Sequence, residues 1–227
     1  MMHRSHIWVL ALLLVGVAAS AQPRLRQPEM YIGAHAGALA SMVYFSPSVE
    51  GISPLTVPIT PNGGLVFRYA GHKVCGLQVE INYMLRGWHE HTTVTETAAA
   101  QEYLRRLHYI EVPFLTHLYF GGRHFRGFLN LGPQVGYCIA DEAQGPLVET
   151  SAPQYRPIQN RFDWGLAGGL GVYYRTNRVG LFQLEVRFNY SLGGIFKTSK
   201  TDYFSQAGPM DLSLNLAYMW EIKRAQK

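Results

Sequence analysis

Alternation between apolar and polar side chains is the feature that most constrains this chain. In residues 181–192, every second position from Phe182 to Leu192 is large and apolar. The positions between them carry Gln, Glu, Arg, Asn and Ser. Successive side chains of a β-strand point to opposite faces, so a period of two predicts a strand with one apolar and one polar face.

Seven further stretches alternate in the same way, which predicts eight strands. They are residues 31–42, 64–70, 77–86, 108–120, 128–139, 162–175 and 211–222. The first of these is mostly Gly and Ala, so its phase is ambiguous. A strand that crosses a membrane at a tilt of about 45° needs about 9–11 residues. No apolar run reaches the length of about 18 residues that a membrane-spanning helix requires, which excludes a helical membrane protein.

The connections between these stretches alternate between long and short. Long connections lie at about 43–61, 87–106, 140–161 and 193–209, and short ones at about 71–75, 121–124 and 176–180. Outer-membrane barrels have short periplasmic turns and longer outside loops. The chain is therefore predicted to be all-β: an eight-stranded antiparallel up-and-down transmembrane β-barrel, with strands over about 31–222 and both termini in the periplasm.

A soluble lipocalin-like barrel is the alternative, because it also alternates, with the apolar face inside. The five lysines all fall in predicted turns, loops or the tail, whereas water-facing strands would carry some; they are Lys73, Lys197, Lys200, Lys223 and Lys227. The polar phase is rich in Gly, Ala, Ser and Asn, which suits a narrow interior filled by side chains. These features favour the membrane barrel.

Residues 1–21 are predicted to be an export signal. One Arg stands in the first six residues, residues 7–19 are apolar, and Ala-Ser-Ala at 19–21 precedes Gln22. That order matches a charged region, an apolar region and a small-residue cleavage site. We expect cleavage after Ala21, which leaves residues 22–227 as a barrel domain. The barrel assembly machinery would insert that domain into the outer membrane of a Gram-negative bacterium.

The candidate site is the set of charged residues on the polar phase of the strands. These are Arg68, Glu80, Arg86, Glu111, Asp163, Glu185 and Arg187. Eight strands leave an interior just wide enough for side chains, and a buried charge is costly unless it is paired. We expect a salt-bridged network that fills the lumen, with Glu80, Glu185 and Arg187 at its centre, rather than a polar pore or a proton-handling cluster.

Aromatic residues stand on the apolar phase toward the strand ends. They are Trp164, Tyr174, Tyr190, Tyr218 and Trp220. Outer-membrane barrels carry aromatic girdles at both membrane interfaces. We expect these five to form such girdles, with outer-membrane lipid as the partner.

Other chemistry has little support in the sequence. His89 and His91 are weak metal candidates, because no third ligand stands at a defined spacing. No nucleophile elbow or Ser/His constellation is present, so we expect neither enzyme activity nor a cofactor. The 20 Lys and Arg are scattered and form no long basic block, which argues against a nucleic-acid partner.

Cys75 and Cys138 are predicted to be free thiols. Their positions place them at opposite rims of the barrel, across an apolar band about 25 Å tall. A disulfide needs Cα atoms within about 7 Å.

Several segments resemble the PorT-like outer-membrane β-barrels of Bacteroidetes. They are YIEVPFLTH at 109–117, GLQVEINY at 76–83 followed by Arg86-Gly87, NLGP at 130–133 and FDWG at 162–165. The resemblance covers about 31–222 and implies the fold and the location. The family is named after a member that assists type IX secretion.

The function expected from these features is a scaffold with a side-chain-filled lumen. It would display four extracellular loops, or dock a protein partner through those loops or the periplasmic face. Two alternatives remain, an accessory component of a type IX-like secretion system and a narrow pore or small-solute transporter.

Overall fold

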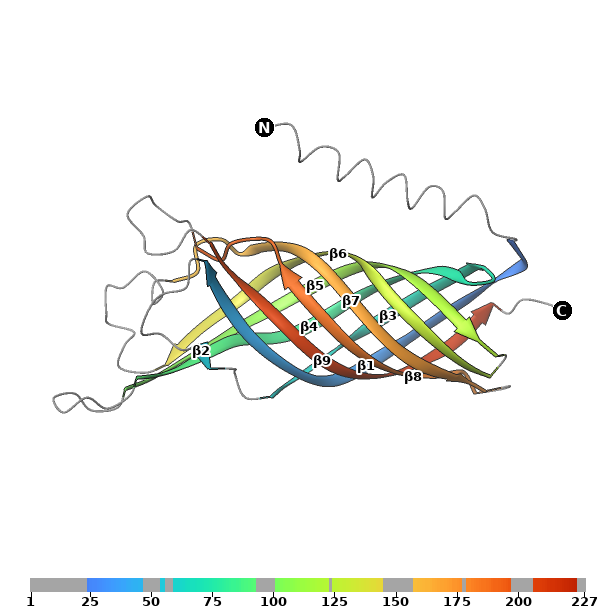
Figure 1. Ribbon diagram of the computed structural model, residues 1–227, viewed down its shortest axis with the longest axis horizontal. Helices are drawn as coiled ribbons and strands as arrows, with labels where there is room; N and C mark the ends of the chain where they lie inside the picture. Colours follow the sequence, from blue (N-terminus) through green and yellow to red (C-terminus); the bar gives the residue numbers. More distant parts are fainter. Residues whose placement is uncertain are drawn as a thin grey trace, which may run out of the picture.

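The computed structural model describes residues 24–46, 54–55, 59–92, 101–122, 124–144, 157–176, 179–196 and 206–223. All strands in these ranges belong to one β-sheet that closes into a barrel (Figure 1). The predicted export signal, residues 1–21, and its cleavage point lie outside the described residues. Within the described ranges, no helix has the length and apolar character to cross a membrane.

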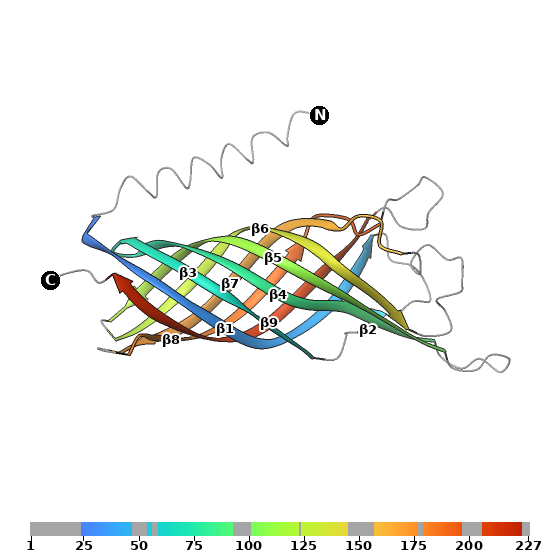
Figure 2. The same cartoon turned by 180° about the vertical axis from the view of Figure 1, so that it is seen from behind.

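Eight long strands form the barrel, which Figure 2 shows from behind. They are β1 (Arg24–Ser46), β3 (Thr60–His72), β4 (Cys75–Thr92), β5 (Gln101–Gly121), β6 (Phe125–Gln144), β7 (Phe162–Arg175), β8 (Leu181–Ser191) and β9 (Gln206–Lys223). Each pairs antiparallel with its neighbours along the chain, and β1 pairs with β9 to complete the circle. The prediction of an eight-stranded antiparallel up-and-down barrel is confirmed.

The apolar phase of the strands faces outward. Leu184, Val186 and Phe188 expose 47%, 43% and 44% of their surface, whereas Glu185 and Arg187 between them expose 2% and 4%. The same alternation recurs around the wall, so the outer surface of the barrel is a continuous apolar band. Such a surface requires hydrocarbon as its solvent, so the soluble-barrel alternative, with its apolar face inside, is wrong.

The short connections, the start of β1 and the end of β9 lie at the same end of the barrel. Arg24 at the start of β1 pairs with His72 at the end of β3, and Lys223 at the end of β9 pairs with Met30. The three short turns join β3 to β4, β5 to β6 and β7 to β8. The four long connections leave from the opposite end (Figure 1). The short turns identify the first end as periplasmic.

Six of the eight long strands are longer than the alternation predicted, among them β4, β5 and β6 at the extracellular end. β4 ends at Thr92 rather than 86, β5 begins at Gln101 rather than 108, and β6 ends at Gln144 rather than 139. The pairing of β4 with β5 and of β5 with β6 continues beyond the last pair of β6 with β7, Tyr137 with Phe162. Outward positions here, such as Arg106 and Glu142, are polar and exposed, so the apolar phase that marks a strand in the sequence is lost.

A ninth, two-residue strand, β2 (Pro54–Leu55), lies in the connection between β1 and β3. It pairs with Glu90 and His89 of β4. Two residues carry no measurable period, so sequence alternation cannot predict such an element.

The outward face gives a depth-dependent prediction. Val186→Arg places a guanidinium on the lipid face in the middle of β8 and should destabilise the folded barrel by about 2–4 kcal/mol. Ile222→Arg, on the outward face near the periplasmic end of β9, should cost about 0–1 kcal/mol. Urea titration of the barrel in lipid vesicles, followed by Trp fluorescence, measures both. Equal costs at the two positions would contradict the membrane placement.

Candidate functional site: the polar lumen

All seven charged residues predicted for the lumen are buried inside the barrel, each exposing 4% of its surface or less. They come from five strands: Arg68 from β3, Glu80 and Arg86 from β4, Glu111 from β5, Asp163 from β7, and Glu185 and Arg187 from β8. Because every second strand residue points inward, strands on opposite sides of the barrel direct these side chains toward one another. They form two separate clusters and one isolated arginine.

The central cluster consists of Glu80, Glu185 and Arg187. The guanidinium of Arg187 donates to both oxygens of Glu80, with Nη1–Oε2 at 2.5 Å and Nη2–Oε1 at 2.7 Å. It also donates to Glu185, with Nη2–Oε2 at 2.8 Å. Since Glu80 is on β4 and Arg187 on β8, this bidentate pair connects strands that are not neighbours in the sheet.

Neutral side chains extend the central cluster on both sides. The Asn82 amide donates to Glu80 at 2.9 Å, and the Asn82 carbonyl lies 2.7 Å from His35 Nε2. The Asn130 amide donates to Glu185 at 2.9 Å, and the Asn130 carbonyl lies 2.7 Å from His117 Nδ1. The central cluster is therefore the middle of a hydrogen-bonded chain that includes residues of β1, β4, β5, β6 and β8.

A glycine makes room for the central cluster. A Cβ built on Gly169 of β7 would lie 2.1 Å from Glu185 Oε1. Strand glycines often mark such close approaches, so this position has to lack a side chain for Glu185 to reach Arg187.

The outer cluster consists of Arg86, Glu111, Asp163 and Asp211. Arg86 donates to Asp211 at 2.5 Å and to Glu111 at 2.6 Å, and its Nη1 lies 3.5 Å from Asp163. One guanidinium thus faces three carboxylates. Two hydroxyl groups supply further donors: Ser41 donates to Asp211 at 2.6 Å and Ser191 donates to Asp163.

Arg68 lies apart from both clusters. Its guanidinium donates to the side-chain carbonyls of Gln78 and Gln183. Its central carbon lies 5.8 Å from the ring centroid of Phe128 and 5.5 Å from that of Tyr173. Among the described residues, no carboxylate forms an ion pair with Arg68, so amide oxygens and aromatic faces stabilise its charge.

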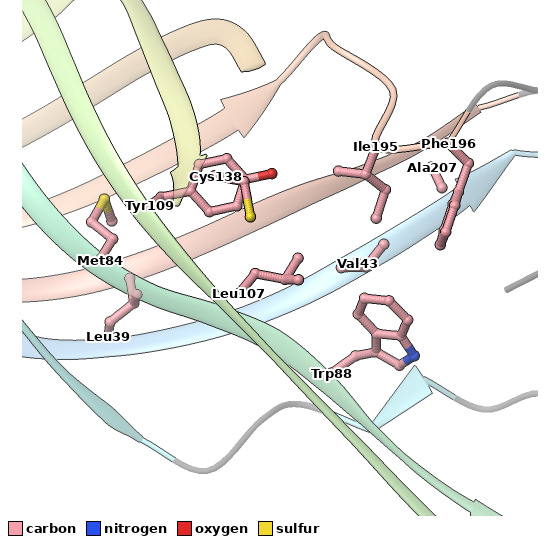
Figure 3. Close-up of a cluster of buried hydrophobic side chains, with 10 residues drawn as sticks. All are labelled: Leu39, Val43, Met84, Trp88, Leu107, Tyr109, Cys138, Ile195, Phe196 and Ala207. Atoms are coloured by element: carbon pink, nitrogen blue, oxygen red, sulfur yellow. The ribbon is translucent and has the colours of Figure 1, made fainter. Parts of the chain in front are cut away.

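The extracellular mouth is filled by an apolar cluster, shown in Figure 3. Its members are Leu39, Val43, Met84, Trp88, Leu107, Tyr109, Cys138, Ile195, Phe196 and Ala207. Ile195 and Phe196 reach it from the connection after β8, where Ile195 N donates to Ala207 O at 2.9 Å. Arg105 holds this region together: its guanidinium lies against the rings of Trp88 and Phe196 and forms two hydrogen bonds with Asp141.

The periplasmic end is closed by a second buried cluster and an ion-paired arginine. The cluster consists of Tyr31, Val66, Ala70, Tyr119, Phe128, Tyr173, Leu181, Ala217 and Met219. Beside it, Arg175 of β7 donates to Glu29 at 2.7 Å and to Glu221 at 2.6 Å. Arg175 thereby ties the end of β7 to the first and last strands of the barrel.

Several of these residues were not among the predicted site residues. Asp211 is the clearest case, because it stands on the polar phase of its stretch and signals a lumen position. Arg105 and Asp141 fall in stretches predicted to be loops, where no period marked them. Glu29 and Arg175 stand at strand ends, where alternation does not say which groups meet.

The five predicted girdle aromatics lie on the outer wall at both ends. Trp164 and Tyr190 are near the extracellular ends of β7 and β8, and Tyr190 stacks on Tyr44 with ring centroids 5.2 Å apart. Tyr174, Tyr218 and Trp220 are near the periplasmic ends of β7 and β9. Trp220 is the most exposed of the five, at 65%.

Two cysteines and two histidines bear on the disulfide and metal predictions made from the sequence. Cys75 and Cys138 are both free, at the start of β4 and toward the outer end of β6. The backbones of His89 and His91 belong to β4, but their side chains lie outside the described part of the structure. Among described residues, no group of three or more His, Cys, Asp or Glu could hold a metal ion.

A closed barrel with an apolar outer wall and a polar, ion-paired interior is the architecture of membrane-spanning β-barrels. The chain belongs to the outer membrane protein beta-barrel domain family, whose model matches residues 20–197. The protein is therefore an outer-membrane β-barrel.

Solved structures with a similar fold include three outer-membrane proteins. OprG from Pseudomonas aeruginosa is 16% identical, with a TM-score of 0.49 over 88% of this chain and 98% of that one. Ail, the attachment invasion locus protein of Yersinia pestis, is 14% identical, with a TM-score of 0.40 over 85% and 99%. Neisserial surface protein A is 13% identical, with a TM-score of 0.44 over 84% and 97%. No curated protein matches the sequence.

The central cluster gives a stability prediction. Arg187→Leu leaves Glu80 and Glu185 buried without a guanidinium and should destabilise the barrel by roughly 3–5 kcal/mol. The triple variant Arg187→Leu/Glu80→Gln/Glu185→Gln carries no unpaired charge and should recover most of that loss. Urea titration in vesicles measures both variants. A cost below about 1 kcal/mol for the single variant would show that the pairing contributes little.

Proposed function

We propose that the protein is a closed scaffold whose role resides in its four extracellular loops, with no transport through the lumen and no enzymatic step. The observation that carries this proposal is the clamp of Arg187 by Glu80 and Glu185, which joins opposite walls of the barrel at its centre. A permeating solute would have to break these charge-assisted hydrogen bonds in a buried environment, at high cost.

The two ends of the barrel support the same proposal. On the extracellular side, Trp88, Leu107 and Ile195 are each at most 1% exposed within the apolar mouth cluster. On the periplasmic side, Tyr31 and Met219 are buried beside the Arg175 ion pairs. A solute would meet an obstacle at each of three levels, which favours a structural or interaction role over conduction.

The resemblance to PorT-like barrels supports the alternative of an accessory to a type IX-like secretion system. Co-purification with translocon subunits, or a secretion defect on deletion, would favour that role. In either role, the barrel assembly machinery is the expected partner during insertion.

Loop display gives a topology prediction. An epitope inserted between Thr95 and Glu96 should bind antibody on intact cells, because residues 93–100 join the extracellular ends of β4 and β5. The matched insertion between His72 and Lys73, in a periplasmic turn, should bind only after permeabilisation. The opposite labelling pattern would show that the barrel has the reverse orientation in the membrane, and it would contradict the scaffold proposal.

The filled lumen gives a conductance prediction. In planar lipid bilayers the wild-type protein should show no resolved channel steps. A control variant, Glu80→Ser/Arg187→Ser/Phe196→Ser, removes the clamp and part of the mouth cluster and should raise the bilayer current. Resolved steps in the wild type, with ion selectivity altered by Glu80→Gln, would favour the narrow pore instead.

A further inference from the structure

The outer cluster carries more negative charge than its one guanidinium can balance. Among the described residues, Arg86 is the single cation in contact with Glu111, Asp163 and Asp211, and all four expose 3% of their surface or less. A buried carboxylate that lacks a counterion takes up a proton rather than remain charged. No group of described acids, His or Cys could hold a metal ion, so a proton is the cation that fits this cluster.

The central cluster has no such excess. Its two carboxylates face Arg187 directly. The side-chain amides of Gln78 and Gln183 donate to these carboxylates and accept from Arg68. Two guanidinium groups thus stand against two carboxylates, so the charge imbalance is specific to the outer cluster.

Two of the three carboxylates in the outer cluster are paired as anions. Asp211 accepts from Arg86 Nε at 2.5 Å, and Glu111 accepts from Arg86 Nη2 at 2.6 Å. Ser41 also donates to Asp211 at 2.6 Å, and the Ser41 oxygen accepts from Gly87 N at 3.5 Å. The hydroxyl hydrogen of Ser41 therefore has a single acceptor, which suits an ionised Asp211.

Asp163 receives no hydrogen bond from the guanidinium. Arg86 Nη1 lies 3.5 Å from Asp163 Oδ2, is buried, and has no hydrogen-bond partner among the described residues. Trp164 N donates to the Asp163 carboxyl, which can accept in its ionised and its neutral form. An ionised Asp163 would draw the unpaired N–H of Arg86 into a charge-assisted hydrogen bond, so this arrangement fits a neutral carboxyl.

The hydrogen-bond balance at Ser191 identifies the position of the proton. Ser191 Oγ lies within hydrogen-bond distance of Asp163 Oδ1 and, at 3.0 Å, of Gly193 O. A hydroxyl has one hydrogen, and a backbone carbonyl only accepts. Beside an ionised Asp163, two buried acceptors would compete for that hydrogen and one would lose its partner, at a cost. With a proton on Asp163 Oδ1, Asp163 donates to Ser191 and Ser191 donates to Gly193, so every group is satisfied.

Gly193 belongs to a segment that enters the mouth of the barrel. This mouth segment, residues 192–196, follows β8, and Gly193 N donates to Trp164 O at 3.1 Å. A Cβ built on Gly193 would lie 2.9 Å from Asp163 Oδ1. The mouth segment therefore passes directly over the Asp163 carboxyl.

The end of the mouth segment closes the barrel. Ile195 and Phe196 pack in the same apolar cluster as Trp88 (Figure 3). Arg105 lies against the rings of both Trp88 and Phe196. Whatever holds the start of the mouth segment in place therefore also holds its apolar end.

We propose that Asp163 binds a proton at neutral pH and donates it to Ser191, so that two consecutive hydrogen bonds, Asp163 to Ser191 and Ser191 to Gly193, tie the mouth segment to the outer cluster. The direction of the first bond is the reverse of the one that an ionised Asp163 would require. The proton compensates part of the excess negative charge and supplies the missing hydrogen at the same place.

The charged and titratable groups around Asp163 come from five strands. They are Tyr44 of β1, Arg86 of β4, Tyr109 and Glu111 of β5, Cys138 of β6 (beside Tyr109) and Asp211 of β9. Carboxylates that share one site do not all remain ionised. Since Arg86 hydrogen-bonds to the other two carboxylates, Asp163 is the one that stays neutral.

Infrared spectroscopy detects this proton directly. The protein is refolded at neutral pH in dodecyl maltoside, a detergent without a carbonyl group, in H2O and in D2O. Exposed carboxyl groups are ionised at this pH, so a C=O stretching band of a carboxylic acid, above the amide I band, reports a buried one. The wild type should show such a band, and it should move to lower frequency in D2O.

Variants assign the band to one carboxyl. Asp163→Asn should remove it. Glu185→Gln, which removes a carboxylate of the central cluster instead, should leave it in place. The heat-modifiable gel shift of a folded barrel checks each variant, and the wild-type spectrum alone tests for the proton.

Trp88 reports whether the hydrogen bonds hold the mouth segment. Trp8→Phe/Trp164→Phe/Trp220→Phe leaves Trp88 as the single tryptophan, and acrylamide quenching measures its accessibility. Ser191→Ala should raise the quenching constant about fivefold, because it removes hydrogen bonds that keep the segment closed. The matched change Ser213→Ala, at another buried serine on β9, should leave it unchanged.

Asp163→Asn should also leave Trp88 protected, because the asparagine amide can donate to Ser191 as a neutral carboxylic acid does. A folded wild type without the acid band would overturn the proposal, as would a band that survives Asp163→Asn or disappears in Glu185→Gln. Equal quenching in the two serine variants would overturn the link to the mouth. The loop-display experiment does not depend on this proton, so failure here is distinguishable from failure of the scaffold proposal.

Discussion

Hydrocarbon provides no hydrogen-bond partner for a peptide group, and this constraint determines the architecture of the protein. Every backbone N–H and C=O in the membrane has to find its partner within the wall, which a sheet achieves only by closing. The pairing of β1 with β9 and of β4 with β5 completes that closure. A closed sheet of eight strands has a lumen just wide enough to be filled by side chains. The hydrocarbon outside therefore determines, through closure, how much space the inward side chains have to fill.

A narrow lumen filled by buried side chains makes charge pairing obligatory. The central cluster pairs Arg187 with two carboxylates, and the outer cluster surrounds Arg86 with three, assisted by Ser41 and Ser191. Arg68 has amide oxygens and aromatic rings instead. These interactions replace the apolar core of a water-soluble protein, and they connect strands that the sheet itself does not pair.

Alternation allowed the fold to be predicted from the sequence. A period of two and the lengths of the connections together define the number of strands, their directions and which side chains point inward. It correctly placed Glu185 and Arg187 inside and Val186 outside. It could not show which inward side chains meet, because that depends on how far each strand is shifted against the next. The partnership of Arg86 with Asp211, distant in sequence, is one example. Alternation did not predict the extracellular ends of β4, β5 and β6. These ends lie outside the hydrocarbon, so their outward positions are polar and the apolar–polar period is lost.

Those outer parts have a consequence for how the protein meets its environment. β6 continues for seven residues past its last pair with β7, which at about 3.3 Å per residue adds roughly 20 Å of strand. The β4–β5–β6 ribbon therefore extends beyond the β6–β7 part of the wall on one flank of the barrel. It places the last backbone pair of β4 with β5, Thr92 with Gln101, well beyond the extracellular end of the β6–β7 pairing, so this ribbon offers an approaching molecule a surface outside the sealed opening.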